Sequence, residues 1–387
     1  MSLIDLQKLS IARYAADGQR AWAERYSPRL PDGSVDTTHL NSDGGFIIGR
    51  IVAEQLAIVQ PELRSHLMVS GPPMPRTTPE DDARVIRVDP NGGGDYPTVQ
   101  QAIDSVRSNN RQPTFIHLAP GEYHERVTIP RDKPFITLVG DDPATTVLTW
   151  HWNADDVGPD GYMLGTGGAY TVEVNADDFR AENITFRNTA GRSGQALALS
   201  ARGDRHVYRN CRMLGYQDTL YVNGGRQYFV ACYIEGAVDF IFGGATAVFD
   251  RCTIHSVASG YIAAPSTPQD QLYGLMFFDC ALTGSEAPTM LARPWRAYGM
   301  AGFVRCVLGE HIAPAGWNNW RNPENETTAR FLEYASTGPG AMPGARVKWA
   351  RQLTPEQAET LTIAEVLRGS DDWRPLVEIP TAHPGER

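Results

Sequence analysis

Five cysteines recur through the middle of this sequence, and their spacing restricts the fold more than any other feature. Cys211, Cys232, Cys252, Cys280 and Cys306 follow one another at intervals of 21, 20, 28 and 26 residues. Each lies in a short segment with the composition of a β-strand, and Gly, Asn and Asp residues, which favour turns, separate the segments. A recurrence of about 20–30 residues that carries strands and turns is typical of stacked coils.

The residue types at this recurring position favour a buried ladder. Ile184, in Asn-Ile-Thr-Phe, and Ile136, in Phe-Ile-Thr-Leu, fill the position upstream of the cysteines. Because free cysteine packs as a small hydrophobe, we interpret the thiols as an internal ladder in a parallel β-helix. Disulfides are the alternative. The odd number of cysteines and the lack of Cys-x-x-Cys and His-Glu-x-x-His motifs argue against a disulfide framework and against zinc, so we expect no metal and no other cofactor.

The coil pattern covers most of the chain, and we expect one β-helix domain over residues 83–376. The segment from Thr98 to Val106 has the pattern of a helix, which would cover the open sheet edge of the first coil. After the last coil, Pro355 to Leu361 and Ile363 to Leu367 have helical patterns. The sequence thus predicts an all-β domain with an N-terminal capping helix and helical tail segments.

The two ends of the chain differ from the coils. Residues 1–82 contain an amphipathic helical pattern from Ile47 to Ile58 and a proline-rich connector at residues 72–75. These residues predict a partly helical N-terminal extension. Residues 377–387 are expected to form a tail.

The charge balance limits the possible partners. The chain has 35 Lys and Arg against 45 Asp and Glu, a formal net charge of −10, so it has no basic field to attract nucleic acid. No uninterrupted apolar run approaches the roughly 20 residues that a membrane-spanning helix needs. We therefore expect no nucleic-acid partner and no membrane span.

Two carboxylates occupy equivalent places on successive coils. Asp218 follows Cys211 by seven residues, and Asp239 follows Cys232 by seven residues. Because adjacent strands lie about 4.8 Å apart, these carboxylates should stand roughly 5–7 Å from each other on one face of the helix. Gln217 precedes Asp218, and Gln195 lies 22 residues before Gln217, about one coil further back. The spacing therefore predicts a polar patch built from three coils.

The surroundings of Asp239 favour a functional interpretation of this patch. Asp239 lies in the apolar run Val-Asp-Phe-Ile-Phe (238–242), and an unpaired buried charge is costly. Arg293 is the candidate partner, since a guanidinium can hold a carboxylate in bidentate fashion and keep it ionised. The alternative is coincidence, because a chain with 45 acidic residues places many of them on surface coils.

Two segments of the chain are highly specific, Asp-Phe-Ile-Phe-Gly (239–243) and Leu-Ala-Arg-Pro-Trp (291–295). Together with the segments given below, they resemble, in order, the signature segments of the pectin methylesterase (pectinesterase) family of carbohydrate esterases, and the resemblance covers residues 84–376. Gly244 departs from it, because many relatives have Asn there, and residues 1–82 have no counterpart. The other segments are Gly-Glu-Tyr-His-Glu-Arg-Val (121–127), Gly-Gln-Ala-Leu (194–197), Gly-Tyr-Gln-Asp-Thr-Leu-Tyr (215–221), Gly-Ala-Arg-Val-Lys-Trp (344–349) and Asp-Asp-Trp (371–373).

The resemblance implies a right-handed parallel β-helix that hydrolyses methyl esters of galacturonate in pectin and releases methanol. It implies Asp239 as the nucleophile of an acyl-enzyme mechanism and Asp218 as the general acid and then the general base. Gln195 and Gln217 would donate hydrogen bonds to the developing oxyanion. Arg293 would orient the ionised Asp239.

Four further residues are expected to bind the substrate. Trp295 would give an apolar platform for a sugar ring, and Tyr221 and Phe242 would line the same groove. Core packing is the alternative for these aromatic residues. Thr166, in the loop Gly165-Thr166-Gly167-Gly168, matches a family substrate contact by its position. The resemblance also implies pectin as the partner of a monomeric enzyme.

The expected location follows from this substrate. The chain begins Met-Ser-Leu-Ile-Asp-Leu, without a basic region that leads into an apolar core, so no signal peptide is visible. Either the protein is cytoplasmic or a signal has been trimmed. We favour a secreted or periplasmic protein with a trimmed signal, because pectin is extracellular.

Other functions remain open at this point. Two carboxylates about 5 Å apart also suit a retaining glycosidase, although two glutamines serve an oxyanion better than an oxocarbenium ion. A non-catalytic polysaccharide-binding β-helix is a second alternative. A third is an esterase or thioesterase of the same fold that acts on another acyl substrate.

Overall fold

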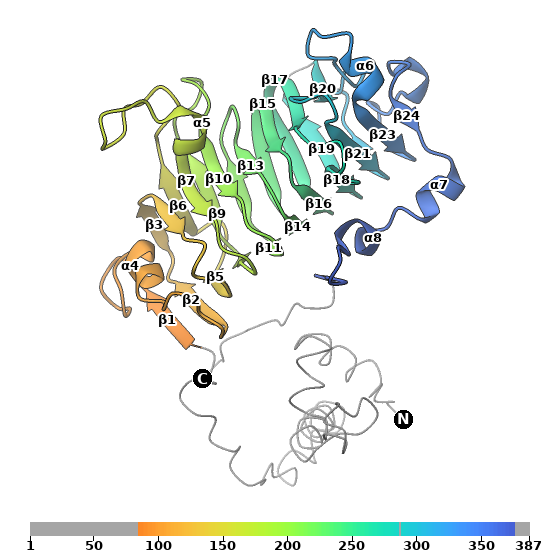
Figure 1. The fold of residues 1–387 in the computed structure, drawn as a ribbon. Helices are drawn as coiled ribbons and strands as arrows, with labels where there is room; N and C mark the ends of the chain where they lie inside the picture. Colours follow the sequence, from red (N-terminus) through yellow and green to blue (C-terminus); the bar gives the residue numbers. More distant parts are fainter. Residues whose placement is uncertain (1–83, 286–287, 376–387) are drawn as a thin grey trace, which may run out of the picture. The chain divides into compact units, whose positions relative to one another are not determined.

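The computed structural model describes residues 84–285 and 288–375. Within them, the pairings between strands are parallel, and the strands stack coil upon coil (Figure 1). The right-handed parallel β-helix predicted from the sequence is confirmed. The described residues belong to one unit, Asp82–Trp373, apart from the last two. The predicted N-terminal extension, residues 1–82, and the predicted tail, residues 377–387, lie outside the described residues, and the domain boundary at residue 83 stays a prediction.

The first face of the helix is a sheet of eleven strands, one from each successive coil. Its strands are short, because each coil turns away after two to five residues. In order they are β1 (Arg84–Val88), β2 (Thr114–Leu118), β5 (Ile136–Gly140), β8 (Arg180–Glu182), β11 (His206–Arg209), β14 (Arg226–Val230), β16 (Thr246–Asp250), β18 (Leu275–Phe278), β21 (Met300–Val304), β23 (Arg330–Tyr334) and β24 (Arg351–Gln352).

Two long, bent strands join the second and third faces. The first parts of β15 (Tyr233–Gly243) and β17 (Thr253–Pro265) pair within the second face, and their last parts pair within the third. The second face also contains β3 (Gly121–His124), β6 (Thr146–Trp150), β9 (Thr185–Asn188), β12 (Arg212–Leu214), β19 (Ala281–Gly284) and β22 (Val307–Leu308). The third contains β4 (Val127–Ile129), β7 (Tyr170–Val174), β10 (Leu197–Ala201), β13 (Leu220–Val222) and β20 (Thr289–Ala292).

The cysteine ladder lies at the corner between the first and second faces. All five cysteines are free and buried, as predicted, and each thiol donates to backbone carbonyls of its own and the preceding coil. Each follows a residue in the left-handed conformation and precedes a strand by one residue, so the thiols lie in the turn and not inside the strand as expected. The left-handed residues are Asn210, Ala231, Arg251, Asp279 and Arg305, with φ between 47° and 54°.

The prediction that two isoleucines extend the cysteine ladder is right for one of them and wrong for the other. Ile184 holds the expected position, because the next residue, Thr185, pairs with Arg212 directly after Cys211. Ile136 instead begins β5 on the first face. The ladder position of that coil is filled by Thr146, which is fully buried.

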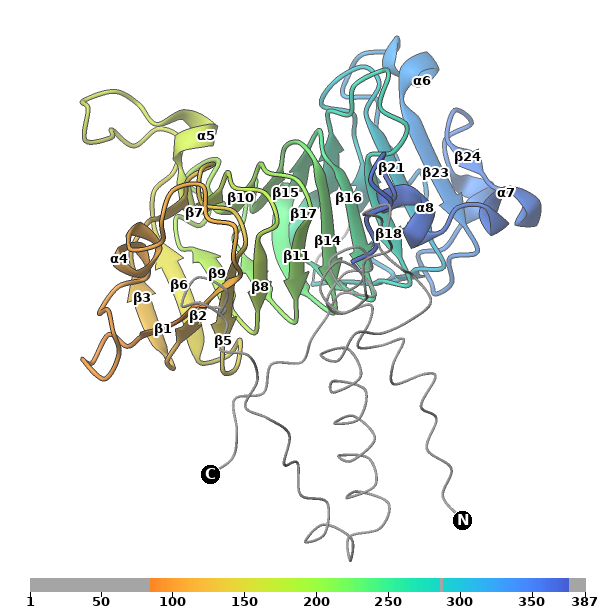
Figure 2. The ribbon, with the colours of Figure 1, turned by 60° about the horizontal axis from the view of Figure 1, so that its bottom comes forward.

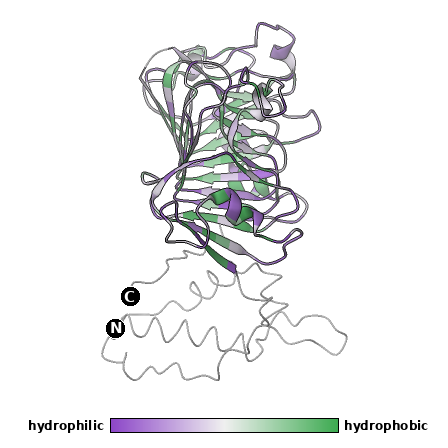
Figure 3. Ribbon diagram, turned by 90° about the vertical axis from the view of Figure 1, so that its left-hand side faces the viewer, coloured by the Kyte–Doolittle hydropathy of each residue, from purple (hydrophilic) through white to green (hydrophobic). Residues whose placement is uncertain are grey.

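An aromatic stack fills the interior behind the first face. Tyr208, Phe229, Phe249, Phe277 and Phe303 lie in register on successive coils, with neighbouring ring centroids 4.6, 4.9, 4.6 and 4.4 Å apart. Such stacked rings add packing energy beyond the burial of their area. Figure 3 shows apolar residues concentrated in the strands and polar residues in the loops around them.

The in-register part of the aromatic stack ends after Phe303 at a buried ion pair, and further ring contacts continue through Trp317 to Phe331 and Trp349. On the next coil Glu333 takes the position in register with Phe303 and is only 2% exposed. Arg346, which is also buried, donates to the Glu333 carboxylate at 3.1 Å and to the Gly340 carbonyl at 2.8 Å. A buried charge of this kind is tolerated because it is paired and hydrogen-bonded.

One described helix packs on the first coil, and two more lie in the tail. The predicted capping helix is α4 (Val99–Asp104), and the Thr98 hydroxyl accepts from the N–H of Gln101 as its N-cap. The predicted tail helices are α7 (Pro355–Glu359), two residues shorter than expected, and α8 (Ile363–Leu367). Two other short helices, α5 (Gly165–Gly168) and α6 (Asn325–Thr328), lie in loops next to the third face (Figure 1).

The tail returns along the outer side of the first face. There α8 lies beside β16 and β18 (Figure 2). Leu367 and Trp373 pack with Val248 and Phe278 in one apolar cluster. Arg226 pairs with Asp204 and, from the tail, Asp371. In the described ranges, 84–285 and 288–375, no helix is long and apolar enough to span a bilayer.

Candidate active site

Asp218 and Asp239 occupy equivalent positions on neighbouring coils of the third face. Gln217 pairs with Val238 in parallel register, which aligns the two residues that follow them. The N–H of Asp218 also donates to the carbonyl of Val238 at 3.1 Å. Both aspartates have left-handed backbones, with φ of 63° and 51°, and are less than 10% exposed. The pairing predicted from the cysteine spacing is therefore present in the fold.

Arg293 holds Asp239 by two charge-assisted hydrogen bonds. Its Nε donates to Oδ1 of Asp239 at 2.8 Å, and its Nη2 donates to Oδ2 at 2.6 Å. Arg293 follows β20, and its backbone N–H donates to the carbonyl of Ala263 in β17 at 3.0 Å. The bidentate pair expected from the sequence is formed across two coils.

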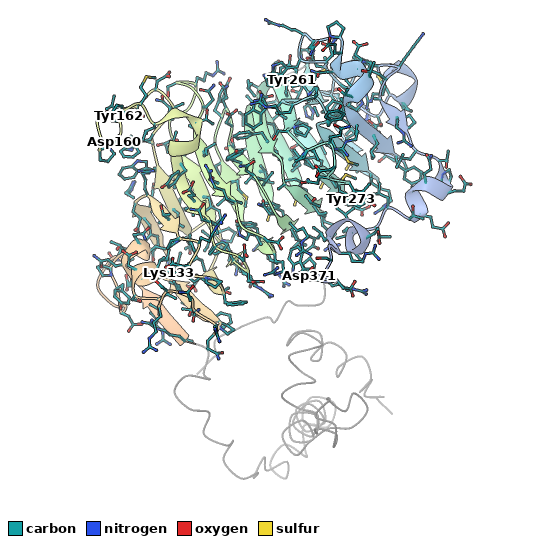
Figure 4. The ribbon with its side chains drawn as sticks, viewed as in Figure 1. Lys133, Asp160, Tyr162, Tyr261, Tyr273 and Asp371 are labelled. Carbon is teal, nitrogen blue, oxygen red and sulfur yellow. The ribbon has the colours of Figure 1, made fainter. Side chains whose placement is uncertain are left out.

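Two aromatic residues that sequence reasoning did not single out contact the same guanidinium. The ring of Tyr261, in β17, lies 3.8 Å from Cζ of Arg293, and the ring of Trp320 lies 3.9 Å from it. Figure 4 labels Tyr261 beside the strands of the third face. A signal for Tyr261 does exist, because it follows Asp239 by 22 residues, which is one coil. Single aromatic residues are too common for that spacing alone to identify one.

The surroundings of Asp218 and Asp239 affect the pKa values of their carboxyl groups differently. Burial, together with the nearby Asp239 carboxylate, raises the pKa of Asp218 to about 8. Burial also raises the pKa of Asp239, but the hydrogen bonds and charge of Arg293 oppose that rise. Only Asp239 has a guanidinium bonded directly to it. The two carboxyls therefore differ in how strongly their surroundings favour the ionised form.

Gln195 and Gln217 lie beside the aspartates on successive coils. Gln195 pairs with Gln217 in an isolated parallel bridge, and Gln217 pairs with Val238 in the next one. Both residues are half-buried. No hydrogen bond involves either side-chain amide within the described part of the chain, so their N–H groups are available to a ligand.

Three of the predicted substrate-binding residues form one aromatic cluster. Tyr221 stacks on Phe242 at 4.5 Å, and the Trp295 ring meets them edge-on at 6.5 and 5.7 Å. Tyr221 and Trp295 are half-buried, whereas Phe242 is only 4% exposed and offers little surface. Trp320 packs against the same cluster and connects it to Arg293. The contact of each of these residues with substrate stays a prediction.

Thr166 lies apart from this cluster. It belongs to α5, which contacts β10 next to the site, and it is half-buried. Its carbonyl accepts from the N–H of Ala169 at 3.3 Å. No side-chain contact joins Thr166 to the aspartates or to Arg293 among the residues that the structure describes, and its role stays a prediction. Over the same residues, no group of three His, Cys, Asp or Glu side chains is arranged to hold a metal ion.

Comparison with known proteins identifies the family. Residues 85–370 match the Pectinesterase family. The chain belongs to the pectinesterase family. It is 44% identical over 283 residues to pectinesterase 31 of Arabidopsis thaliana, which covers 71% of this chain and 89% of that protein. It is 40% identical over 300 residues to pectinesterase QRT1 of the same plant, covering 75% and 78%. The chain is therefore a carboxylic ester hydrolase.

Solved structures of pectin methylesterases have the same fold. A pectin methylesterase from carrot matches with a TM-score of 0.71 and 31% identity, covering 79% of this pectinesterase chain and 98% of that chain. A pectin methylesterase in complex with a hexasaccharide matches with a TM-score of 0.67 and 32% identity, covering 77% and 99%. The fold and the enzyme class expected from the resemblance are confirmed.

Proposed function

We propose that this pectinesterase hydrolyses methyl esters of galacturonate in pectin through an acyl-enzyme on Asp239. The observation that carries the proposal is the pair of buried carboxyls, one bonded to Arg293 and the other with a pKa of about 8. A nucleophile must be ionised and an acid must be protonated at the same pH. The surroundings of Asp239 and Asp218 favour this division.

The first half of the reaction uses Asp239 as nucleophile. One of its oxygens attacks the ester carbonyl carbon, and the carbonyl electrons move to oxygen. The amides of Gln195 and Gln217 donate to that oxyanion, each with an effect of about 2.7–4 kcal/mol when well placed. The oxyanion then collapses, the bond to the methoxy oxygen breaks, and Asp218 gives its proton to the leaving group. The products are methanol and a mixed anhydride on Asp239.

The second half returns the enzyme to its starting state. Asp218, now ionised, takes a proton from a water molecule as the water oxygen attacks the acyl carbon of the anhydride. The bond between that carbon and Asp239 breaks, and Arg293 receives the carboxylate that leaves. One water has been consumed, and one galacturonate carboxyl and one methanol have been formed.

The aromatic cluster beside the aspartates supports a polysaccharide substrate. Tyr221 and Trp295 keep exposed ring surface near the carboxyl pair. Flat apolar rings of this kind suit the faces of sugar units. A related pectin methylesterase has been solved in complex with a hexasaccharide, which supports the same kind of ligand here. We also propose that the enzyme acts outside the cytoplasm, because pectin is extracellular.

Methanol release tests the proposed substrate. The wild-type enzyme should release methanol from methylated polygalacturonate without producing new reducing ends. New reducing ends would indicate a glycosidase instead. Simple acyl esters and an acyl thioester belong in the same assay, and a preference for either would contradict pectin as the substrate.

The variant Asp239→Asn tests the mechanism. Asn tolerates the left-handed backbone of Asp239 but is a poor nucleophile, so turnover should fall by at least about 10³-fold. Binding of a methylated oligogalacturonate should persist. Unchanged methanol release by this variant would contradict the acyl-enzyme mechanism.

A further inference from the structure

We infer that Tyr261 and Trp320 are positioning residues that hold the Arg293 guanidinium in the plane of its two hydrogen bonds to Asp239. The inference rests on the proposed function, because it gives Arg293 the task of orienting the nucleophile. Neither ring is required for the ion pair itself. Each ring restricts a motion that the ion pair leaves free, the tilt of the guanidinium out of the carboxylate plane.

The geometry of the two contacts carries the inference. The ring centroids lie 3.8 and 3.9 Å from Cζ of Arg293, well inside the roughly 6 Å range of a cation–π contact. Two rings this close to one carbon would touch each other if they lay on the same side of it. Tyr261 and Trp320 make no ring contact in the described residues, so they lie on different sides of the guanidinium.

The two rings reach Arg293 from separate parts of the fold. Tyr261 lies in β17, where it pairs with Val238, the residue before the nucleophile. Trp320 lies in the loop before α6, and its N–H donates to the side chain of Asn318 at 2.8 Å. The guanidinium is therefore held between a sheet and a loop, and both supports are fixed by their own hydrogen bonds.

The backbone at Trp320 sets the direction of the loop that carries its ring. Trp320 and Arg321 are both left-handed, with φ of 57° and 56°. Bulky residues rarely adopt this conformation, and they keep it only where the surroundings impose it. Here the conformation places the Trp320 ring against Arg293.

Replacing the rings should impair catalysis more than binding. In Tyr261→Leu and in Trp320→Leu we expect kcat to fall about three- to tenfold, as the loss of one cation–π contact predicts. KM should change less than about twofold, since the bound ground state does not need an oriented Asp239. The variants Tyr261→Phe and Trp320→Phe keep a π face and should retain most of the activity.

The same variants should change the pKa of Asp239. A looser Arg293 favours the ionised carboxylate less, so the pKa of Asp239 should rise and the acid limb of the kcat/KM profile should move to higher pH. Carbon-13 NMR of labelled aspartate measures this pKa directly and needs no turnover. A failure of the proposed function would appear as absent methanol release, while the NMR titration would still test the role of the rings.

A matched control and a double-mutant cycle complete the test. The matched control is Tyr233→Leu, on the second face. It removes a cation–π contact in which Cζ of Arg212 lies 5.2 Å from the Tyr233 ring centroid, and it should leave both kcat and the pKa of Asp239 unchanged. In an Arg293→Ala background, Tyr261→Leu should cause no further loss of kcat if the ring acts through Arg293. Additive losses, or an unchanged Asp239 pKa in both Leu variants, would overturn the inference. If Tyr261→Leu lowers the melting temperature, Trp320→Leu still tests the inference, because Trp320 lies in a loop and not in a strand.

Discussion

Asp218 and Asp239 occupy equivalent positions on neighbouring coils, and both have left-handed backbones, with φ of 63° and 51°. Two adjacent coils therefore change direction together at the same place. The irregular register of β15 between Val238 and Ile241 is part of this change. Aspartate and asparagine tolerate the left-handed region better than most residues, so the fold itself restricts which side chains can occupy these positions.

The pH dependence of kcat/KM should show the ionisation of both Asp218 and Asp239. Asp218 must be protonated to act as the acid, and its pKa is raised to about 8 by burial and by the Asp239 charge. The value of kcat/KM should therefore fall as the pH rises through about 8. It should also fall at low pH, where Asp239 takes up a proton. Initial rates of methanol release between pH 4 and pH 10 test this, and a rate that keeps rising above pH 9 would contradict the role of Asp218.

Asp218→Asn should stabilise the enzyme at alkaline pH. The folded-state pKa of Asp218 is about 8, above the roughly 3.9 of an unfolded aspartate, so the folded state binds the extra proton. Stability from this group is present below the unfolded pKa and is lost as the pH rises through the folded pKa. Asn has no such loss. Above pH 8 we expect the variant to be more stable than wild type by about 0.5–2 kcal/mol, and inactive.

Urea denaturation at pH 4 and pH 9 measures this difference. The advantage of the variant over wild type should be larger at pH 9 than at pH 4. An equal difference at both values would show that Asp218 is not protonated in the folded protein near neutral pH. Circular dichroism would verify that both proteins remain folded at the start of each titration.

Removal of either glutamine amide should slow the chemical step. Gln217→Leu and Gln195→Leu each lose one donor to the oxyanion, and kcat should fall about 10²–10³-fold for a well-placed donor. KM should change little, because the oxyanion exists only after attack. Steady-state kinetics separate the two parameters. A rise in KM with an unchanged kcat would assign the glutamines to substrate binding instead.

The five thiols of the cysteine ladder should not react with alkylating reagents in the native protein. All five thiols are buried, and burial raises the pKa of Cys211 to about 12. Because a buried thiol is closed to the reagent, iodoacetamide at pH 8 should leave the native protein unmodified and should label all five thiols after denaturation. A reducing agent should not change the melting temperature. Labelling of native protein, detected by mass spectrometry, would contradict the buried ladder.

The sequence alone predicts the parts of the site that repeat with the coil. Asp218 and Asp239 share an offset from Cys211 and Cys232, so one regular spacing places both. The spacing works because the coils on either side of the aspartates are short and close in length. It fails for Ile136, whose Phe-Ile-Thr-Leu segment has the same alternation as a ladder strand but belongs to the first face. Apolar alternation does not distinguish the faces of a β-helix, since every face buries one side.

The two aromatic residues that contact Arg293, Tyr261 and Trp320, could not be predicted from the spacing of residues along the sequence. Trp320 lies in a loop whose path depends on consecutive left-handed residues, and no periodic pattern describes such a loop. Tyr261 lies in a strand whose sequence pattern is equally typical of a strand that only packs in the core. The direction of each pKa shift likewise depends on burial, which the sequence indicates for Asp239 through its apolar neighbours but not for Asp218.

The buried pair of Glu333 and Arg346 has a consequence for self-association. An aromatic column that repeats on every coil could serve as a template for a further coil from a second molecule. Here the column is closed by a carboxylate and a guanidinium, and the last strand, β24, offers only two residues. A strand added beyond β24 would find neither a ring in that register to stack on nor enough backbone to pair with. The enzyme thus carries, in its last coil, a barrier against end-to-end growth into fibres.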